Sequence, residues 1–201
     1  MVWRSWAWVV LAAVLLAAVS LVSNMTTPAQ LAGDVDGVLA VRLTLSKLAN
    51  SGTAWAGLLV LAGRIVRDPR QAAAAGILSG WLSLAIHYGL GQLAGIFTPH
   101  IWAENLNWFL ITGAVGAPLG LVGAATGRAD GLGQLSRLVI PLGAVVEPFY
   151  RGMFAQPDVA PWPGVLSSMA CGSVLAGLGA AGLVVALRRP AGRARSLDSA
   201  P

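Results

Sequence analysis

Long apolar segments alternate with short polar segments along most of the 201-residue chain. A helix needs about 20 mostly apolar residues to cross a hydrocarbon core of roughly 30 Å. Six segments approach or exceed that length: 6–22, 53–66, 72–97, 106–126, 132–149 and 164–187. The second is short and is expected to begin a few residues earlier, near Leu48. The pattern predicts an all-α fold, a polytopic membrane helix bundle with six transmembrane helices.

Composition agrees with this interpretation. Hydrophobic residues make up 56% of the chain and charged residues 10%, and the mean hydropathy is +0.72, whereas a soluble domain carries about 25% charged residues. The length leaves room for one membrane domain, residues 1–187, and no separate soluble domain. The single cysteine, Cys171, excludes an internal disulfide. The net charge of +5 comes from clusters beside apolar segments, so we expect the lipid bilayer as partner and no nucleic acid.

The positions of Lys and Arg predict the orientation. Six crossings that start inside place ten of the 13 basic residues on the cytoplasmic side and leave Arg42, Lys47 and Arg151 outside. Because short cytoplasmic loops are enriched in Lys and Arg, we expect a multi-pass protein of the cell membrane, a bacterial inner membrane, with both termini cytoplasmic. Residues 188–201 are expected to form a disordered cytoplasmic tail.

Residues 34–50 do not fit the apolar pattern, because valines and leucines alternate there with Asp34, Asp36, Arg42 and Lys47. A seventh crossing here would invert every later segment and place the arginine clusters outside. We therefore expect a partly helical amphipathic segment on the outer face. The alternative is a lid over an outer cavity.

Small residues recur at helical spacing in several segments. Helices in lipid associate through close backbone approach at such positions. The spacing predicts tight packing within one chain, with contacts between subunits as the alternative. The repeats are Gly76/Gly80, Gly91/Gly95, Gly116/Gly120/Ala124, Gly172/Ala176/Ala180 and the adjacent Ser173/Gly177/Ala181.

Candidate site residues gather at one predicted depth, near the outer side. Ionisable groups inside a membrane are costly and by default indicate a site. The candidate ligand-binding residues are His87, Tyr88, Glu104, Trp108, Glu147, Tyr150 and Arg151. We expect Glu147 to face the bundle interior within reach of His87 or Tyr88, with Arg151 at the outer rim. The alternative is a helix that ends at Pro148, because proline disfavours a helical conformation in the residue before it.

Signatures of known catalysts and metal sites are weak. The sequence contains no HExxH motif and no P-loop. His100 and Glu104 have a spacing compatible with a metal pair, but two ligands make a weak site. We therefore predict no metal site and no catalytic residue, and the sequence indicates no particular cofactor.

Three stretches carry a family resemblance: SGTAWAGLLVLAGRIVRDPRQAAAAG, WFLITGAVGAPLGLVGAATGR and the Glu-bearing fifth apolar segment. Together they resemble a family of small bacterial six-span membrane proteins of unknown function. A looser similarity is to the substrate-binding subunits of energy-coupling-factor transporters, with Ala13 and Ala17 matching an AxxxA pair on the first span. That similarity implies a small-molecule ligand, an outer-facing site and partner membrane subunits.

The sequence leaves three functions open. The first is a small-molecule binding or transport subunit with an outer-facing cavity. The second is a membrane enzyme that acts on an apolar, prenyl-type substrate with Glu147 as the acid. The third is a non-catalytic membrane scaffold.

Overall fold

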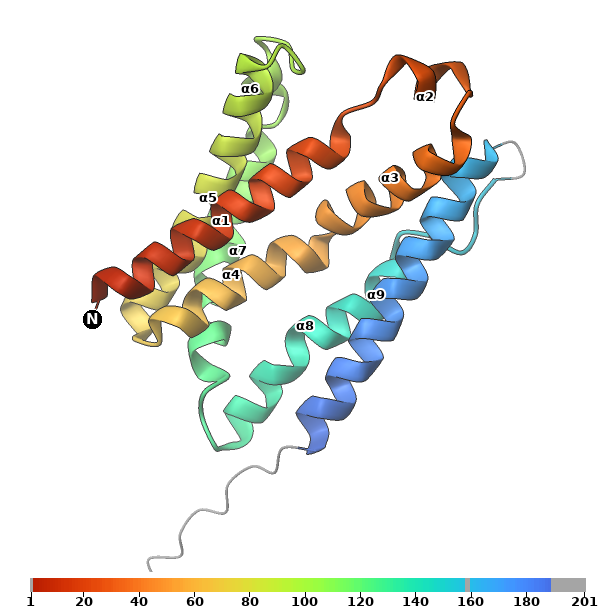
Figure 1. Cartoon of the computed structure of the whole chain (residues 1–201). Helices are drawn as coiled ribbons and strands as arrows, with labels where there is room; N and C mark the ends of the chain where they lie inside the picture. The colour runs from red at the N-terminus through yellow and green to blue at the C-terminus, as the bar shows by residue number, and fades with distance from the viewer. Residues whose placement is uncertain (1, 158–159, 189–201) are drawn as a thin grey trace, which may run out of the picture.

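The computed structural model describes residues 2–157 and 160–188, and all regular secondary structure within them is helical (Figure 1). The predicted tail, apart from Arg188, lies outside the described residues. The helices are α1 (Val2–Asn24), α2 (Pro28–Ala32), α3 (Asp36–Ala49), α4 (Gly52–Val66), α5 (Pro69–Leu93), α6 (Ile101–Glu104), α7 (Leu106–Ala125), α8 (Gly131–Tyr150) and α9 (Trp162–Arg188).

Four of the described helices are long and apolar enough to cross a membrane: α1, α5, α7 and α9. α4 is apolar but has only 15 residues, and α8, which carries two internal prolines, is not among the four. The all-helical fold is confirmed, and the helices fit an integral membrane protein.

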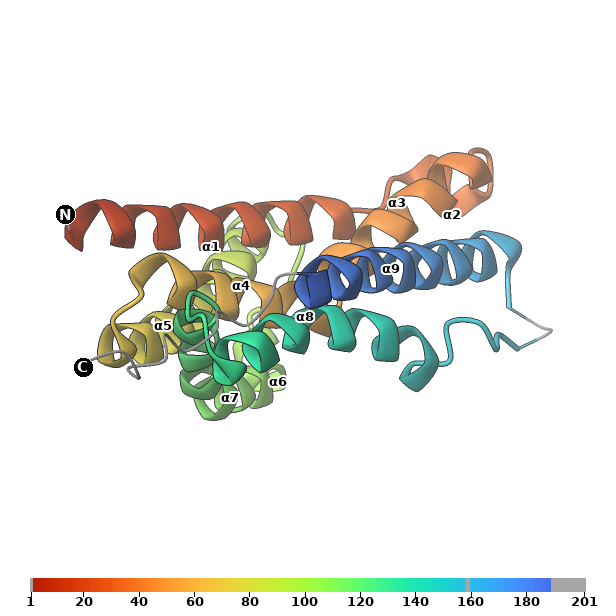
Figure 2. The same ribbon diagram turned by 90° about the horizontal axis from the view of Figure 1, so that it is seen from below.

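The helices form two groups (Figures 1 and 2). In one group, α5 packs against α1, α4 and α7. In the other, α9 packs against α8 and α3. Contacts between the groups are sparser, and α7 and α8 diverge from the short loop that joins them.

Glycines allow backbone contact within the first group, as the small-residue spacing predicts. A Cβ added to Gly120 would meet the carbonyl oxygen of Ala72, and one added to Gly76 would meet that of Gly116. The spacing is less informative on α9: Gly177 is exposed, with open space around its added Cβ among the described residues. The contact between α8 and α9 uses Gly179 instead, which faces Pro141 and Val145.

Residues 34–50 form a short turn and α3, which runs nearly in line with α4 (Figure 1). Asn24, the last residue of α1, accepts hydrogen bonds from Ser46 Oγ at 2.6 Å and Asn50 Nδ2 at 3.3 Å. Because these partners lie at the C-terminal end of α3, most of α3 extends beyond the end of α1, for about 15 Å at 1.5 Å per residue. α3 also packs on α9, and near the C-terminal end of α3 Lys47 donates to Ser167 and Ser168.

Candidate functional site

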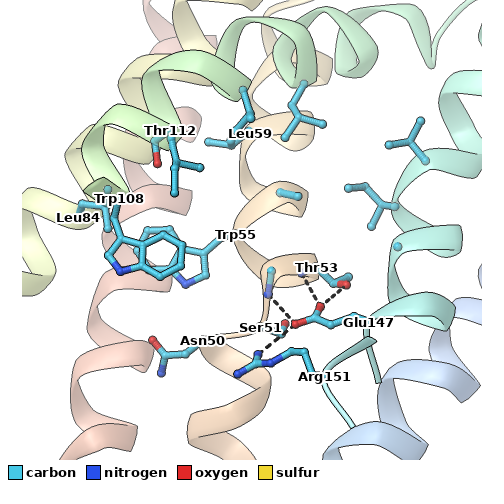
Figure 3. Close-up of a pocket in the computed structure, with 18 of the residues that line it drawn as sticks. Asn50, Ser51, Thr53, Trp55, Leu59, Leu84, Trp108, Thr112, Glu147 and Arg151 are labelled. Atoms are coloured by element: carbon cyan, nitrogen blue, oxygen red, sulfur yellow. Dashed lines mark hydrogen bonds and ion pairs between the residues drawn. The ribbon is translucent and has the colours of Figure 1, made fainter. Parts of the chain in front are cut away.

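A cavity of about 820 Å³ lies between the two helix groups, with walls from α4, α5, α7 and α8 (Figure 3). It brings together six of the seven residues singled out from the sequence: His87, Tyr88, Trp108, Glu147, Tyr150 and Arg151. The seventh, Glu104, is exposed on α6 and does not line the cavity. Glu104 lies apart from the other six because α6 is a separate short helix that leads into α7.

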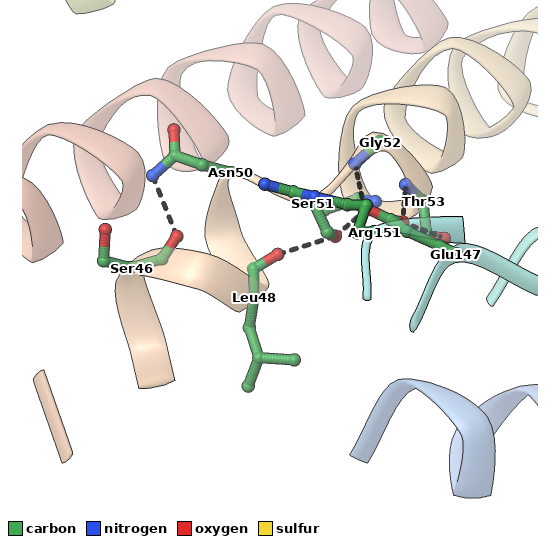
Figure 4. A network of polar contacts seen from close by, with 9 residues as sticks. Ser46, Leu48, Asn50, Ser51, Gly52, Thr53, Glu147 and Arg151 are labelled. Atoms are coloured by element: carbon green, nitrogen blue, oxygen red, sulfur yellow. Dashed lines mark hydrogen bonds and ion pairs between the residues drawn. The ribbon is translucent and has the colours of Figure 1, made fainter. Parts of the chain in front are cut away.

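Glu147 closes one end of the cavity and is held by four hydrogen bonds (Figure 4). Oε1 accepts from the backbone N–H of Gly52 at 2.8 Å and from Arg151 Nη1 at 3.2 Å. Oε2 accepts from the backbone N–H of Thr53 at 2.8 Å and from Thr53 Oγ1 at 2.7 Å. The Glu147 side chain is 11% exposed and that of Arg151 is 45% exposed. The carboxylate therefore faces inward and Arg151 lies at the rim, as expected.

The N-terminus of α4 binds the negatively charged Glu147 side chain. The first N–H groups of a helix have no partner within the helix, and the helix dipole favours negative charge at that end. Ser51 accepts from the Ala54 N–H at 3.0 Å as the N-cap, which leaves the N–H groups of Gly52 and Thr53 for Glu147. The carboxylate thus completes the cap of α4 and joins α4 to α8.

The helix break that creates this N-terminus lies at Asn50 and Ser51. Asn50 caps α3 by donating its side-chain amide to the Ser46 carbonyl at 2.9 Å, and Ser51 donates to the Leu48 carbonyl at 2.8 Å (Figure 4). The sequence prediction began the second span near Leu48, across this break, and so missed the cavity residues of the break itself. The signal was present, because Ser51 precedes an apolar segment as an N-cap does.

Pro148 does not end the helix. α8 continues through it to Tyr150, and Pro148 is fully buried. Because the helix continues, Glu147 and Arg151 lie one turn apart and form an ion pair. The alternative of a helix exit at this position was wrong.

His87 lines the same cavity as Glu147, but its side-chain hydrogen bond runs to Ser20 and not to Glu147. Its Nδ1 lies 3.1 Å from Ser20 Oγ, which donates to Asn50 Oδ1 at 2.6 Å. A hydroxyl has one hydrogen to donate, so Ser20 accepts from His87, and Nδ1 carries the imidazole proton. His87 therefore connects the cavity to the helix break.

The described residues bring together no group of three His, Cys, Asp or Glu side chains that could hold a metal ion. The site consists of one saturated carboxylate, one partly free guanidinium, a histidine and an aromatic and aliphatic wall. Such a set can bind and orient a molecule. Comparison of the chain with protein-family models, with curated proteins and with solved structures finds no significant match.

Proposed function

We propose that this chain is a six-pass membrane protein that binds or transports a small molecule through an outer-facing cavity, with both termini in the cytoplasm. The alternating directions of α1, α4, α5, α7, α8 and α9 support six passes, with α3 outside the bilayer on the outer face (Figure 1). Basic residues support the orientation. Arg64 and Arg137 both bond to Thr126, at the end of the bundle opposite Glu147, and basic clusters favour the cytoplasmic side.

The observation that carries the binding function is the inward-facing, mostly covered carboxylate of Glu147 at one end of an apolar cavity. Sites for small molecules are typically clefts of about 300–1,000 Å³, mostly apolar, with a few convergent polar groups. This cavity has that size and that composition. A carboxylate inside a membrane protein is costly unless it is paired, and the pairing of Glu147 places polar groups from α4 and α8 at a single end.

The hydrogen bonds of Glu147 disfavour the alternative of an acid catalyst. A carboxylate offers about four lone-pair positions, and all four are used by Gly52, Thr53 and Arg151. A general acid needs a proton on one of those positions. The geometry therefore favours binding over proton donation.

Binding is tested by identifying small molecules that remain with the protein. The wild-type chain is isolated in lipid nanodiscs and denatured, and the released molecules are measured by mass spectrometry. The comparison uses a variant that fills the cavity, Gly143→Leu, because a Cβ at this cavity-lining position meets only Thr53 Oγ1, at 3.9 Å, among the described residues. The control is Gly177→Leu on the exposed face of α9.

We expect a species in amounts comparable to the protein in the wild type and in Gly177→Leu, and its depletion in Gly143→Leu. If no species differs between the two variants, the binding function is wrong and the scaffold alternative is favoured. The resemblance to substrate-binding subunits of energy-coupling-factor transporters supports transport in company with partner membrane subunits. Co-isolation of an ATPase and a coupling membrane subunit with the tagged chain tests that part.

A further inference from the structure

The two ends of the cavity differ in polarity, and this difference constrains the proposed ligand. The groups that bond to Glu147 all lie at one end. From there, the cavity wall continues along α8 as far as Val139, a rise of about 12 Å from Glu147. Along α7 the mostly apolar wall runs from Trp108 to Leu119, a rise of about 16 Å. The cavity therefore offers a long apolar channel that ends in a compact polar region.

The apolar channel is open on the side between α7 and α8. These helices diverge from their connecting loop and contact each other little (Figures 1 and 2). On these two helices the cavity wall includes three exposed valines, with Val115 at 41%, Val139 at 37% and Val146 at 56%. In a bilayer this gap opens to lipid tails, because both helices lie in the transmembrane bundle that we propose. The channel is thus continuous with the hydrocarbon phase.

The polar end presents hydrogen-bond donors. Arg151 has five N–H donors and uses one of them on Glu147, whose lone pairs are filled. Within the described residues, the indole N–H groups of Trp55 and Trp108 have no hydrogen-bond partner. Figure 3 shows both indole nitrogens on the side of their rings that faces the end with Glu147 and Arg151. A molecule seated here meets unused donors and a carboxylate that has no acceptor capacity left.

Resting on the proposed binding function, we propose that the ligand is an amphiphile taken from the lipid phase, with an apolar body and a head that accepts hydrogen bonds. Carboxylate, phosphate and ester oxygens share that chemistry. The body lies along the channel between α7 and α8, and the head lies against Arg151, Trp55 and Trp108. The positions of Trp108 and Tyr150 at helix ends match the headgroup depth at which aromatic residues are enriched.

The first test separates released molecules by phase. Protein in nanodiscs of defined phosphatidylcholine is denatured, and the aqueous and organic extracts of the wild type, Gly143→Leu and Gly177→Leu are compared. We expect an organic-phase species in the wild type and in Gly177→Leu. Its amount per protein should fall about tenfold or more in Gly143→Leu, because the leucine side chain would occupy the space that the bound molecule fills.

Three results contradict the proposal in different ways. A water-soluble species depleted in Gly143→Leu would leave the binding function intact and exclude the lipid-phase ligand. An organic extract that contains only the nanodisc phosphatidylcholine, in equal amounts for all three proteins, would mean adventitious lipid only. The absence of any differing species in either phase would remove the binding function as well.

The second test measures the head chemistry with two probes of equal chain length. Palmitic acid and hexadecylamine are titrated into the wild-type protein in nanodiscs and followed by native mass spectrometry. We expect the acid to bind at least about tenfold more tightly than the amine, since a carboxylate can accept from the unused donors of Arg151, whereas an ammonium would face the positive charge of that guanidinium. Equal affinity, or tighter binding of the amine, would overturn the assignment of the head. This test needs no variant, so it holds even if Gly143→Leu fails to fold.

Discussion

Replacing Glu147 with Gln should destabilise the fold, because this carboxylate joins α8 to the first turn of α4. The amide keeps one oxygen, which can still accept two hydrogen bonds, for example both from Thr53. Its NH₂ group cannot accept from the Gly52 N–H or from Arg151. Hydrogen bonds to charged groups contribute about 1.5–3 kcal/mol each. Because Gly52 and Arg151 are both partly exposed, water compensates part of the loss, and we expect a net cost of about 1–3 kcal/mol.

This cost can be measured as a change in the thermal unfolding midpoint in detergent. For a chain of this size, 1 kcal/mol corresponds to about 2–4 °C, so Glu147→Gln should lower the midpoint by about 2–12 °C. The matched control is Glu104→Gln, since Glu104 is exposed on α6. A double-mutant cycle of Glu147→Ala with Thr53→Val should give a coupling of about 0.5–3 kcal/mol, because alanine removes the oxygen to which Thr53 donates. If the Glu147→Gln and Glu104→Gln variants have the same unfolding midpoint, or if the coupling is absent, the assignment of Glu147 as a link between α4 and α8 is wrong.

Three further predictions concern packing, pH and topology. Gly120→Leu should lower the unfolding midpoint strongly and Gly177→Leu hardly at all, because a Cβ at position 120 meets backbone of α5 whereas position 177 is open; equal effects would contradict the glycine contact. Asp130 in the α7–α8 loop pairs with Arg128, which lowers the pKa of its carboxyl to about 2. Its contribution to stability should therefore be complete above about pH 4, the unfolded value, and be lost as the pH falls toward 2, and a pH profile unchanged by Asp130→Asn would contradict this. Cysteine labelling from outside should reach Asp34→Cys and not Asp68→Cys, and the reverse result would overturn the proposed orientation.

The sequence alone predicts the class of the fold well. Apolar segments locate α1, α5, α7, α8 and α9 within a few residues, because the length of a membrane helix follows from the thickness of the bilayer. The spacing of small residues identifies the contact of Gly116 and Gly120 with α5. That prediction succeeds because close approach of two helices requires small side chains at fixed intervals. Properties of this kind depend on local pattern, and local pattern is visible in one chain.

Only the tertiary structure decided which polar groups meet. Glu147 and Gly52 are 95 positions apart, and nothing in the local pattern of either predicts their hydrogen bond. The pattern suggested His87 as the partner, because the predicted spans place both residues near the outer side. The partner depends instead on the break at Asn50 and Ser51, which exposes the N–H groups of α4 toward α8. Depth along a helix follows from residue number, whereas the direction that a side chain faces depends on how the helices are rotated and packed against one another.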